Sequence, residues 1–112
     1  MSDETHRQSA FALAVADLLV FANVEKYEVT FGEAWRPPEM AAIYARDGRG
    51  IKNSLHVRRL AIDLNLFIDG EYQTGTAAYK PLGEYWEKIL GGRWGGRWGD
   101  GNHFEFSPVP DT

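Results

Sequence analysis

Residues 60–68 form the stretch that most limits what this 112-residue chain can fold into. Every second residue is aliphatic, so an extended chain would have two different faces. One face would carry Leu60, Ile62, Leu64, Leu66 and Ile68, and the other Ala61, Asp63, Asn65 and Phe67. Period-two alternation of this kind is typical of a β-strand with one buried face. We therefore predict a central strand that packs its aliphatic face on the core and carries Asp63 on the opposite face.

Asp63 needs a partner, because an unpaired carboxylate in so apolar a strand is costly to bury. His56 lies just before the strand, in the loop that leads into it, and would bring a second metal-ligand type to the same place. Arg58 and Arg59 are equally near and offer an ordinary salt bridge. This stretch alone leaves both interpretations open.

A second stretch, Asp100-Gly-Asn-His103, favours the metal interpretation. The chain has three histidines, and His6 falls on the exposed first turn of a predicted helix, which leaves His56 and His103. His103 and Glu105 share one face of a short alternating run, with phenylalanines on the other face. Two histidines, the strand aspartate and a spare carboxylate are the set that a catalytic zinc needs: three protein ligands, an open position for water and a general base.

The two stretches together resemble the motifs of the M15 family of zinc D,D-/L,D-peptidases. Ser54-x-His56-x6-Asp63 matches the family pattern Ser-x-His-x6-Asp, and Asp100-x-x-His103 matches (Asp/Glu)-x-x-His. The resemblance covers residues 27–106 and is greatest to the small phage members. It implies that His56, Asp63 and His103 bind one zinc ion per chain and that Asp100 is the catalytic base.

The resemblance extends to an upstream arginine and has one departure. Trp35-Arg36-Pro37 matches the family's arginine context, and the Trp-Gly-Gly run before the last motif matches too. Arg36 and Ser54 would then orient the substrate or stabilise an oxyanion; without the resemblance, Arg36 reads as a surface residue stacked on Trp35. The family often has glycine where this chain has Arg59, so we expect a different loop geometry there.

The implied substrate is the peptidoglycan stem peptide. Among the family's activities we favour L-alanyl-D-glutamate endopeptidase, acting as a phage endolysin. A D-alanyl-D-alanine carboxypeptidase or dipeptidase is the alternative, and a non-catalytic wall-binding domain of the same fold is a third reading that the presence of Asp100 disfavours. Glu105 is the rival candidate for the base.

Composition excludes other classes of function. The net charge of −4 argues against a general nucleic-acid or anionic-membrane binder. Without cysteine, thiolate zinc sites and disulfides are excluded. At this length we expect one domain over residues 1–112, monomeric, with residues 107–112 as a flexible tail.

The predicted architecture is α+β: a small antiparallel sheet with about three helices on its aliphatic face and the zinc site on the other. Besides the central strand we expect a helix over residues 1–26, capped by Ser2 or Asp3, a strand over 27–31 and a helix over 38–46. Asp69-Gly70 predicts a hairpin turn, residues 79–90 a third helix, and 103–106 a last strand.

The apolar run in the first helix is too short for a membrane span, and we interpret it as a core helix rather than a Sec signal. The protein would then be made in the host cytoplasm and reach the wall through a holin or lysis.

The tandem Gly-Gly-Arg-Trp of residues 91–98 has two readings. Arginine, aromatic and glycine residues in alternation can bind single-stranded nucleic acid by stacking. We favour a tight loop beside the metal, in which Trp94 and Trp98 line the cleft or fill the core.

Overall fold

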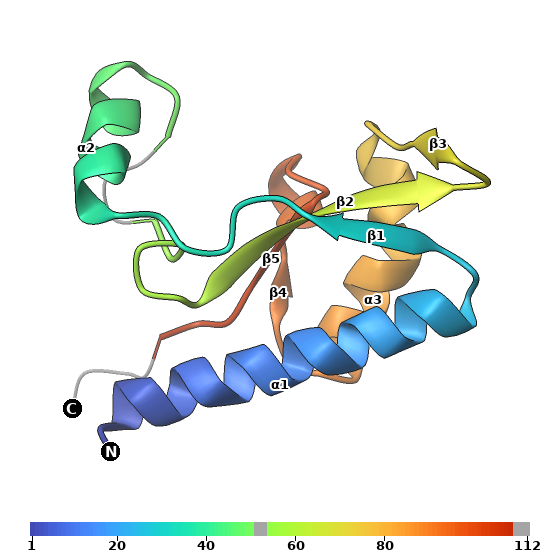
Figure 1. The fold of residues 1–112 in the computed structure, drawn as a ribbon, viewed down its shortest axis with the longest axis horizontal. Coiled ribbons are helices and arrows are strands. Elements are labelled where there is room, and N and C mark those ends of the chain that lie inside the picture. Colours follow the sequence, from blue (N-terminus) through green and yellow to red (C-terminus); the bar gives the residue numbers. More distant parts are fainter. Residues whose placement is uncertain (51–53, 109–112) are drawn as a thin grey trace.

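The computed structural model describes residues 1–50 and 54–108 and confirms the α+β class, with a five-stranded antiparallel sheet (Figure 1). Two short 3-10 helices, Thr76–Tyr79 and Gly95–Trp98, join the longer elements. The α-helices and β-strands follow in this chain order: α1 (Asp3–Val24), β1 (Glu28–Phe31), α2 (Pro38–Arg46), β2 (Ala61–Ile68), β3 (Glu71–Tyr72), α3 (Lys80–Lys88), β4 (Arg93–Trp94) and β5 (His103–Glu105).

Strand β2 is the centre of the sheet. It lies between β1 and β5, and β4 pairs with the outer side of β5. In the β2–β5 ladder Asp63 is directly opposite His103, and Ala61 is opposite Glu105. Side chains directly opposite each other on antiparallel strands share a face, so this register brings two of the predicted metal ligands together from positions 40 residues apart.

The aliphatic face of β2 is buried, as its alternation predicted: Leu60, Leu64 and Leu66 are 0–1% exposed. Helices α1 and α3 cover this face and supply Leu18 and Trp86 to the same core. Helix α2 lies apart from them, near the start of β2 (Figure 1). Two helices, α1 and α3, therefore pack on the core, and α2 lies next to the loop that leads into β2.

Helix α1 begins at Asp3, where the Ser2 hydroxyl accepts a hydrogen bond from the backbone of Thr5 at 3.1 Å. It ends at Val24, two residues earlier than predicted. Contrary to the prediction that its apolar run is too short for a membrane span, α1 as a whole is long and apolar enough to cross a membrane by length and composition. Its inner face nevertheless packs in the core, with Phe11 7% and Leu18 0% exposed.

The predicted hairpin turn is confirmed. Asp69 and Gly70 both have positive φ, 52° and 79°, the conformation of a tight turn whose twist matches the strands it joins. Strand β3 then pairs with the end of β2. Strand β4 was not predicted, because we read residues 91–102 as a loop. In the C-terminal tail, Arg7 Nε donates to the Ser107 carbonyl at 3.0 Å, and residues 109–112 lie outside the described part.

Candidate active site

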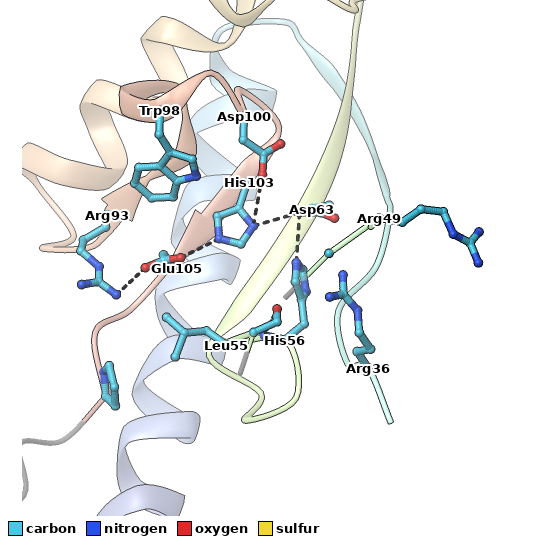
Figure 2. A pocket seen from close by; sticks show the side chains of 13 residues that line it. Arg36, Arg49, Leu55, His56, Asp63, Arg93, Trp98, Asp100, His103 and Glu105 are labelled. Carbon is cyan, nitrogen blue, oxygen red and sulfur yellow. Dashed lines mark hydrogen bonds and ion pairs between the residues drawn. The ribbon is translucent and has the colours of Figure 1, made fainter. Parts of the chain in front are cut away.

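A cleft of about 670 Å³ opens on the face of the sheet opposite the aliphatic core (Figure 2). It gathers the predicted metal ligands, Asp100 and several arginines onto one surface. The cleft is lined by Arg36, Arg49, Gly50, Ser54, Leu55, His56, Asp63, Arg93, Trp98, Asp100, His103, Glu105 and Pro108.

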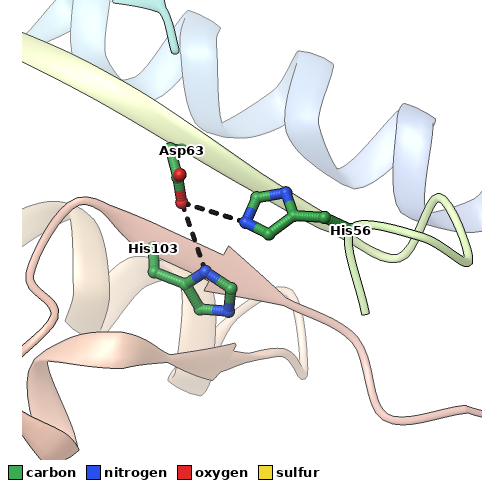
Figure 3. A group of neighbouring side chains, drawn as sticks. All are labelled: His56, Asp63 and His103. Atoms are coloured by element: carbon green, nitrogen blue, oxygen red, sulfur yellow. Dashed lines mark hydrogen bonds and ion pairs between the residues drawn. The ribbon is translucent and has the colours of Figure 1, made fainter. Parts of the chain in front are cut away.

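His56, Asp63 and His103 converge within this cleft (Figure 3). Asp63 Oδ1 lies 3.3 Å from His56 Nε2 and 3.2 Å from His103 Nδ1. Tetrahedral zinc with bonds of about 2.0–2.1 Å separates its ligand atoms by about 3.3 Å. The two distances from Asp63 Oδ1 match this separation, and all three donor atoms lie within 4.8 Å of one another. The donor set fits zinc, and these three residues are the group that would hold it.

Local structure explains why these side chains meet. Asp63 and His103 are fixed by the β2–β5 register, whereas His56 is placed by its loop. The Ser54 hydroxyl accepts a hydrogen bond from the His56 backbone at 3.2 Å, and the His56 carbonyl accepts one from the Arg36 backbone, also at 3.2 Å. Ser54 therefore helps to hold the loop that carries His56.

The electrostatics of the cluster are those of tightly paired charges. Burial opposes the charge on Asp63, but hydrogen bonds from His103 and His56 outweigh it and lower the Asp63 pKa to about 2. Burial also opposes the charge on His103, yet its hydrogen bonds to Asp63 and Glu105 raise the His103 pKa to about 9. Without a metal, His103 is thus a cation held between two carboxylates.

Glu105 lies on the other side of the His103 ring. Its Oε1 is 2.7 Å from His103 Nε2, and its other oxygen is ion-paired with Arg93 (Figure 2). Burial opposes the Glu105 charge, but His103 and Arg93 lower the pKa of Glu105 below its usual value. Trp98 stands next to the same ring, edge to face at 5.9 Å between centroids.

Asp100 differs from the buried carboxylates in its freedom. Its side chain is 51% exposed at the cleft rim, with Oδ2 3.9 Å from His103 Nδ1, too far for a hydrogen bond. Its turn is fixed from below: the Asp100 backbone donates to the Gly95 carbonyl at 2.8 Å, and Trp94 Nε1 donates to the Gly101 carbonyl at 2.7 Å. An exposed carboxylate on a turn held by these hydrogen bonds can contact a water molecule in the cleft.

A family model described as D-alanyl-D-alanine carboxypeptidase, of the M15 peptidases, matches residues 47–106, more than half of the chain and the segment that carries all three clustered ligands and Asp100. The chain belongs to the M15 peptidase family. It is therefore a hydrolase of the peptidoglycan-acting kind. A search of curated proteins found no match.

Arg36 of this M15 peptidase lies in the cleft and is mostly buried, with 13% of its side chain exposed. Its Nε donates to Glu33 Oε1 at 2.7 Å, and its guanidinium lies 5.1 Å from the centroid of the Tyr44 ring. It does not stack on Trp35 as a surface residue would. Arg36 therefore lines the cleft with its guanidinium ion-paired to Glu33.

The two arginines that offered Asp63 a salt bridge are engaged elsewhere. Arg58 is ion-paired with Glu4 of α1 at 2.7 Å, and Arg59 lies over the Trp35 ring at 4.4 Å. Arg59 also has a φ of 60°, a left-handed conformation that glycine adopts at less cost. A glycine at this position would therefore be compatible with the turn seen here, and the expected difference in loop geometry from other family members stays a prediction.

The sequence did not predict that Arg49 and Arg93 line the cleft of this M15 peptidase, or that Glu33 lies near His56. Glu33 Oε1 lies between Arg36 and the Nδ1 of His56, 3.8 Å from the latter, and that Nδ1 is buried without a hydrogen-bond partner among the described residues. The signal was present in the three-residue spacing of Glu33 and Arg36, which we read only as a strand end. The roles of the tandem tryptophans were left open, and the structure divides them, as Trp94 is 4% exposed and Trp98 is 56% exposed.

Proposed function

We propose that this M15 peptidase is a zinc-dependent L-alanyl-D-glutamate endopeptidase of the phage endolysin type. The observation that carries the zinc dependence is the convergence of His56, Asp63 and His103 at zinc-like spacing, with the Asp100 carboxylate at the cleft rim. The resemblance of its motifs to those of the phage members supports the choice of bond. D-alanyl-D-alanine carboxypeptidase is the second candidate, favoured by the description of the matching family.

Each residue then has a chemical role. Zinc, when bound, polarises a carbonyl oxygen and lowers the pKa of water. Asp100 accepts the proton of the attacking water and passes it to the leaving amine, a general acid–base role for which its exposed, uncrowded carboxylate is suited. The rival base, Glu105, is already hydrogen-bonded to His103 and ion-paired with Arg93.

The arginines suit an anionic substrate. A γ-linked D-glutamate keeps its α-carboxylate free, directly beside the bond to L-alanine, and a D-alanyl-D-alanine terminus also ends in a carboxylate. Arg36 is held toward the cleft by Glu33 and Tyr44 and would bind such a group through charge-assisted hydrogen bonds. Ser54, which also lines the cleft, would contact the substrate next to His56.

The deciding experiment is digestion of purified peptidoglycan with the zinc-loaded protein, followed by mass spectrometry of the products. A new free amino group on D-glutamate is the expected result, whereas release of D-alanine would replace our choice with the carboxypeptidase. No cleavage of any stem-peptide bond by a folded, zinc-loaded sample would overturn the enzymatic proposal.

Two variants separate metal binding from catalysis in the same assay. Asp63→Ala removes a ligand and should lose zinc, activity and the stability that metal binding adds. Asp100→Ala should keep zinc and a similar unfolding transition but lose activity by about 10²–10⁴-fold, the usual contribution of proton transfer. Wild-type turnover in Asp100→Ala would refute its assignment as the base.

We also propose where this enzyme is made and where it acts. An endolysin of this type is made in the host cytoplasm and meets the cell wall after holin-dependent release or lysis. Fractionation of infected cells before and after lysis would test this.

A further inference from the structure

Glu105 makes two contacts, with His103 and with Arg93, that a general base would not need. It is a carboxylate at the floor of the cleft, 8% exposed, and it accepts the proton of His103 Nε2 at 2.7 Å. The opposite nitrogen of the same ring, Nδ1, faces Asp63 at 3.2 Å. The His103 ring is therefore held between two carboxylates, one on each nitrogen.

The two ring nitrogens of a histidine cannot both be free to bind a metal. When one nitrogen carries the proton, the other presents a lone pair, and a fixed acceptor decides which is which. Histidines that bind metals commonly donate their second N–H to a carboxylate, which fixes both the tautomer and the ring orientation. Glu105 is placed to do this for His103.

We propose that Glu105 is a positioning residue that binds the Nε2 proton of His103 and so directs Nδ1 toward Asp63 and His56. This inference rests on the zinc site of the proposed function and adds to it a residue outside the ligand set. Glu105 acts through His103 and does not contact the substrate's reacting atoms.

The support around Glu105 is rigid. Arg93 is directly opposite Glu105 in the β4–β5 ladder, and the two side chains form an ion pair. From the core side, the indole Nε1 of Trp86 donates to both backbone carbonyls, to Glu105 at 3.0 Å and to Arg93 at 3.2 Å. Trp86 is 0% exposed. Side chain and backbone are thus both fixed, as orienting a neighbouring ring requires.

A second glutamate–arginine ion pair, Glu87–Arg97, serves as a control for the Glu105–Arg93 pair. Glu87 of α3 is ion-paired with Arg97 at 2.6 Å, as Glu105 is with Arg93, and it also accepts from the backbone of Trp94. It contacts neither histidine of the cluster. Glu87→Gln therefore removes an equivalent carboxylate from the neighbouring structure without touching a metal ligand.

The experiment compares zinc affinity, measured by competition with a chelator, in wild type, Glu105→Gln, Glu105→Met and Glu87→Gln. Gln still offers a neutral oxygen acceptor, whereas Met offers only a weakly accepting sulfur. The zinc affinity should therefore fall about tenfold in Glu105→Gln and about a hundredfold in Glu105→Met, the range seen when a metal-binding histidine loses its hydrogen-bond partner. Glu87→Gln should bind zinc as wild type does.

Two further measurements exclude a merely structural role. The Nε2 proton of His103 should give a slowly exchanging NMR signal in zinc-loaded wild type and in Glu105→Gln, and it should exchange fast with water in Glu105→Met. Activity of Glu105→Met should rise with added zinc, because its defect is one of metal affinity. If Glu105 were the base, zinc would bind normally and extra zinc would restore nothing.

The outcomes separate this inference from the function it rests on. A wild-type protein that binds no zinc overturns both. A wild type that binds zinc while Glu105→Met binds it equally well overturns only the positioning role. Should Glu105→Met fail to fold, Glu105→Gln decides, and an affinity within about twofold of wild type counts against the proposal.

Discussion

The sequence Gly-Gly-Arg-Trp occurs twice in succession, at residues 91–94 and 95–98, and the two copies fold differently. The first copy ends in strand β4, with Trp94 buried at 4% exposure and Arg93 paired with Glu105. The second is a 3-10 helix that leaves Trp98 56% exposed beside the cleft and pairs Arg97 with Glu87. The same four residues therefore contribute a buried side chain to the core in the first copy and an exposed side chain to the cleft wall in the second.

The difference comes from what each copy meets, because local propensity is the same for both. Strand β5 offers the first copy a free edge, and Trp94 enters the core between two glycines whose Cβ atoms would lie 2.1 Å and 2.2 Å from its ring, Gly83 and Gly96. The second copy has no such edge and turns toward Asp100. Tertiary contacts outweigh intrinsic β-propensity in cases of this kind.

The tryptophans should show the largest difference. Trp94→Ala removes a buried ring and its hydrogen bond to the Gly101 carbonyl, and should lower the free energy of unfolding by about 3–5 kcal/mol. Trp98→Ala, at an exposed site, should change it by about 0.5 kcal/mol or less while slowing peptidoglycan digestion. Urea unfolding of both variants measures this. Equal losses of stability would mean that the two copies are not distinct in solution.

The first glycine of each copy gives an intermediate test. A Cβ on Gly95 would lie 2.2 Å from the Asp100 carbonyl oxygen and 2.8 Å from the His103 Cβ, so Gly95→Ala should cost about 1–3 kcal/mol and displace both residues. Gly91 has open space but a φ of 75°, so Gly91→Ala should cost about 1–2 kcal/mol from backbone strain alone.

The measurement that separates the two glycines is zinc affinity alongside thermal unfolding. Gly95→Ala should weaken zinc binding as well as stability, and Gly91→Ala should affect stability only. Normal zinc affinity in Gly95→Ala would show that the Asp100 turn can move without disturbing the metal ligands.

The arginines should show the smallest difference. Arg93→Gln leaves Glu105 with one cation fewer, and we expect a zinc affinity a few-fold weaker than in wild type, less than the loss in Glu105→Gln because the His103 contact remains. Arg97→Gln removes an exposed ion pair remote from the ligands and should leave zinc affinity unchanged. A weaker affinity in Arg97→Gln would refute the assignment of separate roles.

Several features could be predicted because a local pattern was enough to define them. The alternation of residues 60–68 set which face of β2 is buried, and Asp69-Gly70 set the hairpin, since few dipeptides adopt two positive φ angles. The convergence of His56, Asp63 and His103 followed from motif spacing through the family resemblance. The structure explains that spacing by the direct opposition of Asp63 and His103 in the ladder.

Other features depended on contacts that no local pattern reveals. Identical tetrapeptides cannot predict that one Arg pairs with Glu105 and the other with Glu87. Glu33 looks like an ordinary surface acid in the sequence, and only the fold places it near His56. The alternation placed Glu105 on the same face as His103, but it did not show that the two side chains are hydrogen-bonded. The left-handed conformation of Arg59 was equally invisible, because arginine is not a residue that signals it.

The position of β5 in the sheet has a consequence for synthesis. Helix α1 is synthesised before the strands, yet its Phe11 packs edge to face against Trp86 and Phe106 near the other end of the chain. Strand β2 can pair with β5 only after β5 has also been synthesised. Contacts across nearly the whole chain cannot form until those late residues have left the ribosome, and such long-range closure slows folding. Because His103 begins that same strand, the nascent chain lacks a complete ligand set until its core can close. The cluster of His56, Asp63 and His103 therefore cannot form before β5 has been synthesised and has paired with β2.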